Sequence, residues 1–527
     1  MQLHGTQIID GQPSAAPGAS TFQATNPAIG QKIAPAFQEA TAADVDRACQ
    51  AAAGAFDAVR AKSPAERAKL LRAIADEIVK LGDELIVRAT EETGLPRPRI
   101  EGERGRTCGQ LKLFADVVEE GSWVDARIDR AQPERQPLPK PDVRRMLAPL
   151  GPVAVFGASN FPLAFSVGGG DSASALAAGC PVVCKGHPAH PGTSEMVARA
   201  AQTAVAACGF PPATFSLLQG AGIEVGAALV RHPAIQAVGF TGSLKGGRAL
   251  FDEAARRPHP IPVYAEMGST NPVFLLPGAL KERADKLAEG LVGSVTLGVG
   301  QFCTKPGLVF APQADRAFVD AAVKLFDAAA PGVMLHEGIR TNFERGAARL
   351  GAVIGVETAV KGGRPDGGAG CGQRARMFVT SAANLAQRPE IAEEVFGPST
   401  VIVTTASRDE VLAAARNLEG HLTATIHGTP DDLKEWAPLV SILQTKVGRI
   451  IFNGWPTGVE VTHAMVHGGP YPATTDPKFT SVGTTAILRW ARPICWQNFP
   501  DAALPEELRD ANPRKIWRRV EGQLTRE

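Results

Sequence analysis

Hydrophobic residues in the first 120 positions recur at the spacing of amphipathic helices. Thr41 with Asp44, and Ser63 with Glu66, have the spacing of a helix capping box. After each box, apolar residues recur every three or four positions on one helical face. We therefore predict a group of helices in this part of the chain, after short extended pieces in residues 1–40.

After residue 150 the pattern changes to short apolar runs that alternate with helical stretches. The four runs are residues 153–156, 181–185, 215–218 and 237–240. Buried strands that alternate with helices predict a parallel, doubly wound α/β sheet. Ligands of such sheets bind beyond the carboxyl ends of the strands, where Asn160, Lys185 and Gly242 fall.

A second set of apolar runs begins near residue 273 and includes residues 302–310, 401–403 and 450–453. Helical stretches lie between these runs, near residues 281–297, 315–329, 408–417 and 431–443. The alternation of strand-like and helical patterns predicts a second α/β domain.

Two further segments predict a small β arm. Residues 128–146 are rich in proline and basic residues, a pattern that is too irregular for a core element. Near the C-terminus, residues 484–489 form a strand-like run that is suited to pairing with this earlier segment. Such pairing, within or between subunits, favours an oligomer, and we expect a homodimer or a homotetramer.

Composition narrows the class of protein. The 527 residues include 55 Lys and Arg against 54 Asp and Glu, so the formal net charge is +1. This balance provides no overall attraction to nucleic acid or to a membrane surface. The N-terminus has no cationic segment followed by an apolar one, and no apolar run approaches the length of a membrane span. Because the eight cysteines form no CxxC pairs, we expect reduced thiols in a cytoplasmic protein that binds neither nucleic acid nor membrane.

Cys303 is a candidate nucleophile, because it lies in a glycine-bracketed turn at residues 300–304, between a helical run and a strand-like run. On this residue alone the alternative of a small buried hydrophobe stays open. The chain has no GxSxG motif of a serine hydrolase. His463 and His467 lie four residues apart, but no acid follows at ligand spacing. We interpret both as core or loop histidines and expect no metal.

Six segments, at the spacing of one family, resemble the NAD(P)-dependent aldehyde dehydrogenase superfamily over nearly the whole chain. They are FGASNFP (156–162), Lys185, FTGS (240–243), EMG (266–268), GQFC (300–303) and EVFGP (394–398). Three further stretches, at residues 166–171, 185–195 and 456–461, resemble the members of that family that oxidise α-ketoglutarate semialdehyde to 2-oxoglutarate.

The resemblance implies a fold of two doubly wound α/β domains, one for the cofactor and one for catalysis, with a small β oligomerisation arm. The expected dinucleotide-binding domain comprises residues 1–127 and 147–266, and the expected catalytic domain comprises residues 267–470. The arm is expected in residues 128–146 and 471–500, and residues 501–527 are expected to form a C-terminal tail.

The resemblance also assigns the catalytic roles. An aldehyde gives up a hydride only from a tetrahedral adduct, and the Cys303 thiolate is a good nucleophile and a good leaving group for that adduct. The Asn160 amide and the Cys303 backbone N–H would stabilise the oxyanion, and Glu266 would activate water to hydrolyse the thioester. Since Ala265 and Met267 flank Glu266, we expect burial to raise its pKa. A helix-capping or ion-paired glutamate is the structural alternative.

The cofactor contacts that the resemblance implies are Lys185, Gly242, Ser243, Gly247, Glu394 and Phe396. Gly242 opens a helix, whose N-terminal amides favour a pyrophosphate. Lys185 and Glu394 would hold the two ribose regions, although a solvated strand end and a solvated acidic cap are the alternatives for these two residues. Many NAD-preferring relatives have a glutamate where this chain has Pro188. The loss of that carboxylate makes NADP the expected cofactor and NAD the second choice.

The substrate channel implied by the resemblance is lined by Arg106, Gln110, Phe161, Phe165, Phe302 and Trp455. Arg106 could pair with the distal carboxylate of an ω-oxo acid, or it could be a solvated arginine in a locally basic stretch. Other semialdehydes and medium-chain aliphatic aldehydes are alternative substrates. A coenzyme A acylating enzyme and a noncatalytic binding protein on the same fold are the alternative functions.

Overall fold

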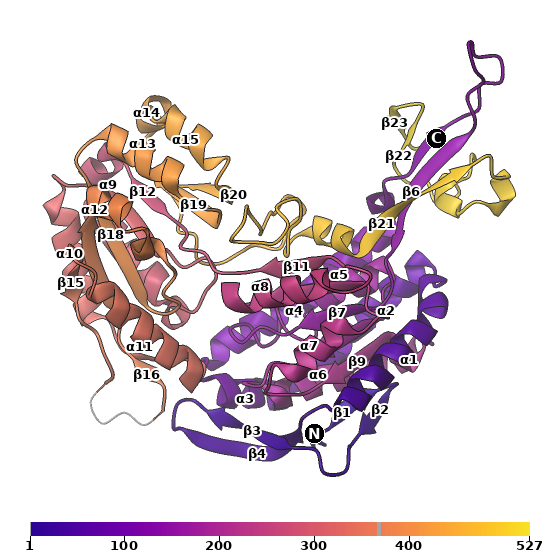
Figure 1. Ribbon diagram of the computed structural model, residues 1–527, viewed down its shortest axis with the longest axis horizontal. Coiled ribbons are helices and arrows are strands. Elements are labelled where there is room, and N and C mark those ends of the chain that lie inside the picture. Colours follow the sequence, from indigo (N-terminus) through magenta and orange to yellow (C-terminus); the bar gives the residue numbers. More distant parts are fainter. Residues whose placement is uncertain (1, 366–369) are drawn as a thin grey trace.

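The computed structural model describes residues 2–365 and 370–527, and these residues form two α/β bodies and a projecting arm (Figure 1). The first body contains the N-terminal part of the chain, and the second body begins with the strand at residue 273. The arm projects from the first body and carries the C-terminus. Among the described helices, none is long and apolar enough to cross a membrane.

The first sheet has seven strands, of which five are parallel. Its order is β11 (Val263–Glu266), β10 (Ala237–Thr241), β7 (Val153–Phe156), β8 (Val182–Lys185), β9 (Phe215–Leu218), β1 (Gln7–Ile9) and β2 (Gln12–Ser14). The strand order reverses between β7 and β10, and this reversal is the switch point of a doubly wound sheet. Asn160 follows β7 and Gly242 follows β10, so both lie at the switch point.

Helices cover both faces of this sheet, which explains why its strands are continuous apolar runs. One face packs against α2 (Pro64–Lys80), α4 (Arg97–Glu120), α5 (Gly170–Ala178) and α6 (Pro191–Ala207). The other packs against α1 (Ala42–Arg60), α7 (Glu224–Arg231) and α8 (Leu244–Ala255). The predicted capping boxes of Thr41 and Ser63 are present at α1 and α2. Helix α3 (Gly82–Thr93) ends at Gly94, whose φ of 67° is the left-handed conformation that favours glycine.

The second sheet also has seven strands, and only its edge strand β15 is antiparallel to its neighbour. Its order is β15 (Glu357–Val360), β17 (Arg376–Ser381), β18 (Ser399–Thr405), β13 (Leu308–Pro312), β12 (Val273–Leu275), β19 (His421–His427) and β20 (Val447–Phe452). Helices α9 (Pro277–Thr296) and α10 (Arg316–Ala328) cover one face. The helices on the other face are α11 (Glu337–Gly351), α12 (Ala382–Gln387), α13 (Arg408–Asn417) and α15 (Ala437–Leu443), with α14 (Pro430–Glu435) just before α15.

The predicted strand over residues 302–310 is wrong in its first half. After the 3₁₀-helix η3 (Leu297–Gly300), the chain turns, and the Lys305 N–H donates to the Phe302 carbonyl oxygen at 3.1 Å. Pro306 has no N–H for a sheet ladder, so the strand β13 begins only at Leu308. The nucleophile candidate therefore lies in a loop. The described residues also form two antiparallel two-stranded sheets, the hairpin of β3 (Thr21–Asn26) with β4 (Gln31–Gln38) and the pair of β14 (Gly332–Val333) with β16 (Gly372–Gln373).

The arm is a five-stranded sheet that differs from the prediction in two respects. Its order is β21 (Ala491–Gln497), β6 (Val143–Pro149), β5 (Arg127–Asp129), β22 (Arg518–Val520) and β23 (Gln523–Thr525). The segment Thr484–Trp490 is a 3₁₀-helix instead of the expected strand, because Ile487 and Trp490, three residues apart, are both buried in the core of the first body. Residues 501–527 form no separate tail, because Leu504, Leu508 and Ile516 pack with the start of the arm and β22 pairs with β5.

Candidate active site

Cys303 lies in the loop between η3 and β13, and close backbone contacts shape this loop. The three residues 298–300 all have left-handed φ values. A Cβ atom at Gly300 would lie 2.3 Å from the carbonyl oxygen of Gly397, so the loop requires glycine there. The Asn271 side-chain amide donates to the Cys303 carbonyl oxygen at 2.8 Å and holds the other side of the loop.

The three residues predicted to be catalytic meet at one cavity between the two bodies. Cys303, Glu266 and Asn160 all line this cavity, whose volume is about 470 Å³. Asn160 follows β7 and Glu266 ends β11, so both come from the first body, whereas Cys303 comes from the second. The Asn160 side-chain amide donates to the Gln301 carbonyl oxygen at 3.0 Å, which places that amide beside the nucleophile loop.

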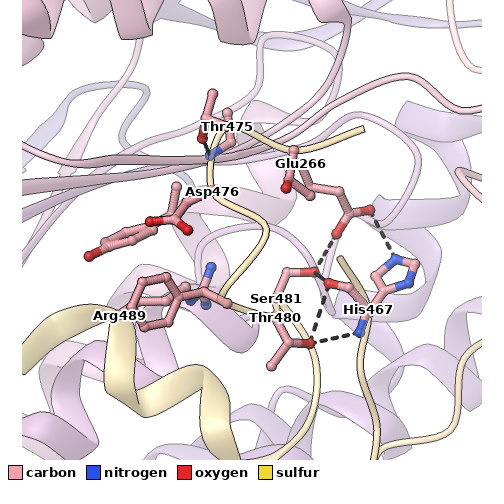
Figure 2. Close-up of a pocket in the computed structure, with 11 residues that line it drawn as sticks. Glu266, His467, Thr475, Asp476, Thr480, Ser481 and Arg489 are labelled. Carbon is pink, nitrogen blue, oxygen red and sulfur yellow. Dashed lines mark hydrogen bonds and ion pairs between the residues drawn. The ribbon is translucent and has the colours of Figure 1, made fainter. Parts of the chain in front are cut away.

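Glu266 is a buried carboxylate with two side-chain partners. Its Oε1 atom lies 2.9 Å from His467 Nε2, and its Oε2 atom accepts a hydrogen bond from the Ser481 hydroxyl (Figure 2). Burial raises the pKa of Glu266, but His467, Ser481 and Cys303 outweigh burial and hold that pKa below its ordinary value. The expectation of a raised pKa is therefore wrong, because it took account of the apolar chain neighbours and not of residues distant in the sequence.

The Cys303 thiol has the opposite shift. Burial raises its pKa well above the ordinary value, the nearby Glu266 carboxylate adds to this effect, and the Arg106 cation opposes it. Its Sγ atom lies 3.3 Å from His467 Nε2. The resting residue is thus a thiol that has both a carboxylate and an imidazole beside it.

The cofactor residues that were predicted divide into two groups. Gly242, Ser243, Glu394 and Phe396 line the 470 Å³ cavity, where His187 and His336 join them. Lys185, Pro188 and Gly247 lie outside its lining. Lys185 ends β8, and burial lowers its pKa to about 8. Gly247 has a packing role, because a Cβ atom there would lie 2.7 Å from the Met267 side chain.

The donor set of this cavity fits a nicotinamide dinucleotide. The N-terminus of α8 opens at Ser243, and helix N-termini bind phosphates through free N–H groups. Across the cavity, Glu394 offers a carboxylate for ribose hydroxyls. Gly268 lets this carboxylate come close to the chain, since a Cβ atom there would lie 2.4 Å from Glu394 Oε2.

Three of the predicted channel residues form an aromatic cluster. Phe161 and Phe302 make an edge contact with ring centroids 5.3 Å apart, and Phe165 packs against Phe161 at 5.1 Å. The Arg106 guanidinium lies 5.2 Å from the Phe165 ring, and the Arg99 guanidinium lies 4.3 Å from the Phe161 ring. Two cations therefore flank the aromatic cluster next to the nucleophile.

Arg106 is half-buried, and within the described residues its buried Nε and Nη2 atoms have no hydrogen-bond partner. With Gln110, it lines a groove whose other lining residues include Val459, Glu460 and Val461. Two of its three guanidinium nitrogens are therefore withdrawn from solvent, unlike those of a fully solvated surface arginine. Trp455 is placed elsewhere: its ring lies 4.5 Å from the His427 ring and packs over Gly290 of α9.

His467, Ser481 and Arg99 are site residues that the sequence interpretation missed. His467 was assigned to a core or a loop, and it is buried, but it lies between the nucleophile and the carboxylate. No local pattern marks this position, because Cys303 and Glu266 are each more than 160 residues away in the chain. His463, by contrast, is exposed.

The two α/β sheets and the cavity between them are those of an oxidoreductase that binds a dinucleotide across a switch point. Residues 15–471 match the model of the aldehyde dehydrogenase family, and the chain belongs to that family. It is 53% identical over 527 residues to alpha-ketoglutaric semialdehyde dehydrogenase 2 of Azospirillum brasilense, with 99% of this chain and 100% of that protein covered. It is 45% identical to alpha-ketoglutaric semialdehyde dehydrogenase of Acinetobacter baylyi, with 99% of each chain covered.

A solved structure supports the fold. The NAD⁺ complex of an aldehyde dehydrogenase from Bacillus cereus superposes with a TM-score of 0.79 at 24% identity, covering 93% of this chain and 96% of that one. This likeness confirms the predicted aldehyde dehydrogenase fold.

Proposed function

We propose that this aldehyde dehydrogenase oxidises α-ketoglutarate semialdehyde to 2-oxoglutarate with NAD(P)⁺ as the cofactor. The observation that supports this substrate is Arg106, a half-buried cation beside the aromatic cluster whose buried Nε and Nη2 atoms have no hydrogen-bond partner among the described residues. Buried polar groups are normally hydrogen-bonded, so such a cation favours a substrate that brings a carboxylate. The full-length similarity to two proteins named for this semialdehyde supports the same substrate.

The residues around the cavity supply the protein's part of the reaction. Cys303 attacks the aldehyde carbon as a thiolate, and the carbonyl oxygen becomes an oxyanion that accepts hydrogen bonds from the Asn160 amide and the Cys303 backbone N–H. When bound, the nicotinamide ring supplies a hydride acceptor. Glu266 then removes a proton from water, whose oxygen attacks the thioester carbon and releases the acid and the thiolate. A hydrolytic base in this position favours water over coenzyme A as the acyl acceptor.

Removal of the Arg106 cation tests the substrate. We expect the Arg106→Ala variant to lose about 10- to 100-fold in kcat/KM for α-ketoglutarate semialdehyde, because a hydrogen bond to a charged group contributes about 1.5–3 kcal/mol. For butanal, a neutral aldehyde, kcat/KM should change little. The measurement is the initial rate of reduced cofactor formation with each aldehyde.

The matched control is Arg97→Ala, on the same helix but paired with Asp83 and Glu101 at the surface. This variant should keep the wild-type preference. Unchanged selectivity in Arg106→Ala would remove Arg106 from substrate recognition, and a higher efficiency with succinate semialdehyde in the wild type would replace the proposed substrate.

We further infer a preference for NADP⁺ over NAD⁺. This inference rests on Pro188, which follows the cavity-lining residue His187 and carries no charge that would repel a 2′-phosphate. The wild type should have the higher kcat/KM with NADP⁺, and Pro188→Glu should reverse that ratio by disfavouring the phosphate. A wild-type preference for NAD⁺ would contradict the inference.

A further inference from the structure

His467 occupies the space between the two groups that carry the proposed chemistry. Its Nε2 atom is 3.3 Å from Cys303 Sγ and 2.9 Å from Glu266 Oε1. One polar side-chain atom of each residue, the His467 nitrogen, the Cys303 sulfur and a Glu266 oxygen, lies within 4.8 Å of the other two. The contact with Cys303 Sγ is a hydrogen bond, whereas Glu266 Oε1 lies at ion-pair distance and, within the described residues, has no hydrogen-bond partner at this ring orientation. A reorientation of the same ring would direct its Nε2 atom to the base.

The backbone around His467 holds the ring in this position. The His467 N–H donates to Thr480 Oγ1 at 2.7 Å, and the His467 carbonyl oxygen accepts from the Ser481 N–H at 2.9 Å (Figure 2). The Ser481 hydroxyl contacts both the His467 carbonyl oxygen, at 3.1 Å, and Glu266 Oε2. The turn that contains these two hydroxyl residues thus positions His467 and Glu266 together.

The proton on the ring is assigned from its surroundings. Within the described residues, Nδ1 of His467 is buried without a hydrogen-bond partner. A buried N–H without a partner is rarer and more costly than an unused lone pair, so Nδ1 carries the lone pair and Nε2 carries the hydrogen. The ring then presents its N–H to the sulfur and to the carboxylate.

We propose that His467 is a fourth catalytic residue, beside Cys303, Glu266 and Asn160, and that it donates its Nε2–H to the Cys303 thiolate when that thiolate forms and to the Glu266 carboxylate when it does not. This proposal rests on the roles proposed above for Cys303 and Glu266, but not on the identity of the aldehyde.

The steps balance without any further reactant. The Cys303 S–H bond breaks, its proton passes to a Glu266 oxygen, and the Nε2–H of His467 turns from the neutralised carboxyl group to the new thiolate. The thiolate then forms the C–S bond to the substrate. Before hydrolysis Glu266 releases the thiol proton to solvent and becomes a carboxylate again. It then takes a proton from water, the hydroxide oxygen attacks the thioester carbon, the C–S bond breaks, and the Nε2–H of His467 donates to the departing thiolate. His467 itself neither gains nor loses a proton.

The alternative role is that of a base. In that case the Nε2 lone pair would take the thiol proton, and the product would be a thiolate and an imidazolium. In that role Nδ1 would carry a hydrogen, and this buried N–H would have no hydrogen-bond partner among the described residues. The free-energy cost of such an unpartnered N–H favours the donor role. Substitutions that keep or remove an N–H at the Nε2 position distinguish the two roles.

The test is the pH dependence of Cys303 alkylation by iodoacetamide in the full-length protein without cofactor or aldehyde, because only the thiolate reacts. The extent of reaction is measured on the peptide that contains Cys303, since Cys495 is exposed and also reacts. The variants are His467→Leu, which removes the N–H, His467→Gln, whose amide reaches the Nε2 position, and His467→Asn, whose amide falls short of it.

For His467→Leu and His467→Asn we expect alkylation at pH 7.5 to be slower by about tenfold or more, with the midpoint of the pH profile raised by about one pH unit. His467→Gln should remain within about threefold of the wild type, because it keeps the charge-assisted donor. The other charged residues that act on the thiol, Glu266, Glu394, Arg106 and Arg449, are unsubstituted in all four proteins, although His467 also lowers the pKa of Glu266.

Two results would overturn the proposal. Wild-type alkylation profiles in the Leu and Asn variants would show that His467 only fills space. A Gln variant as slow as the Leu variant, with the wild-type melting temperature, would show that the ring acts as a base. If the Leu variant does not fold, the Gln and Asn pair decides alone, since the two differ by one methylene group. Because alkylation needs no aldehyde, an error in the proposed substrate would leave this test unaffected.

Discussion

Glu394 is a residue of the cofactor cavity whose charge depends on pH near neutrality. Burial raises its pKa to about 7, while the neighbouring Lys305 cation opposes that rise. Lys305 is itself buried and is held by the carbonyl oxygens of Val395 and Ser399 at 3.1 and 2.8 Å. The predicted ribose-binding carboxylate therefore changes its charge in the physiological pH range.

We expect the KM for the cofactor to rise as the pH falls through about 7. An ionised carboxylate accepts hydrogen bonds from both ribose hydroxyls, whereas the protonated form has lost one of these acceptors. Because the pKa is raised, the charged form is present above about pH 7 and is lost below it, with up to about a tenfold change per pH unit. Steady-state kinetics between pH 5.5 and 8.5 measure this effect.

Two variants make the assignment specific to Glu394. Glu394→Gln should have a high KM that no longer changes over this range. Lys305→Met should move the inflection to higher pH, because it removes the cation that favours the carboxylate. A KM for the cofactor that is independent of pH in the wild type would contradict the prediction.

At the scale of elements, the contact between α8 and β11 sets the position of the helix end that faces the cavity. Gly247 lies in the first turn of α8, and a Cβ atom there would lie 2.7 Å from Met267 and 3.1 Å from Ala265. Helix and strand are therefore as close as a glycine allows. The predicted pyrophosphate site at Gly242 and Ser243 depends on this approach.

We predict that Gly247→Ala displaces α8 and weakens cofactor binding. The added methyl group overpacks the contact with β11, which typically costs about 1–3 kcal/mol. Fluorescence titration should give a higher dissociation constant for the cofactor. Gly54→Ala is the matched control, because Gly54 also lies in a helix, α1, but nothing lies within 4 Å of an added Cβ atom. Equal cofactor affinity in both variants would refute the proposed role of the contact.

How far such elements can be predicted depends on whether their determinants are local. The capping residues Thr41 and Ser63 act within one turn, so the sequence predicts the starts of α1 and α2 correctly. The 3₁₀-helix at Thr484–Trp490 was predicted as a strand, because its conformation depends on burial against α5, where Trp490 Nε1 donates to Ser174 Oγ at 2.7 Å. Helix α11 was also missed; its buried face includes a charged residue, Arg340, which pairs with Glu337 and Glu344.

The same distinction applies to the site. Cys303, Asn160 and Glu266 stand in short motifs at strand or loop ends, so a family resemblance locates them without a structure. The relation of His467 to these residues, and the lowered pKa of Glu266, arise only when distant segments pack together. Likewise, Trp455 has the composition of a channel residue, but its position over Gly290 is decided by the packing of α9.

At the scale of the whole molecule, the arm presents unpaired strand edges to solvent. The five-stranded sheet ends at β21 on one side and at β23 on the other. Within β23, Leu524 is 59% exposed, and Trp517, just before β22, is 44% exposed. Exposed edges with apolar residues favour association with another chain, as the predicted homodimer or homotetramer requires.

If the arm is the oligomerisation element, a charge on its apolar edge should lower the molecular mass in solution. Leu524→Asp places a desolvation cost at the interface, so the variant should dissociate at protein concentrations at which the wild type remains a dimer or tetramer. Sedimentation velocity over a dilution series measures the shift. Ile354→Asp is the control, because Ile354 is 77% exposed but lies after α11, in the second body. A lower mass in Ile354→Asp alone would show that the subunit contact lies on the second body and not on the arm. A monomeric wild type would exclude a subunit contact at either place.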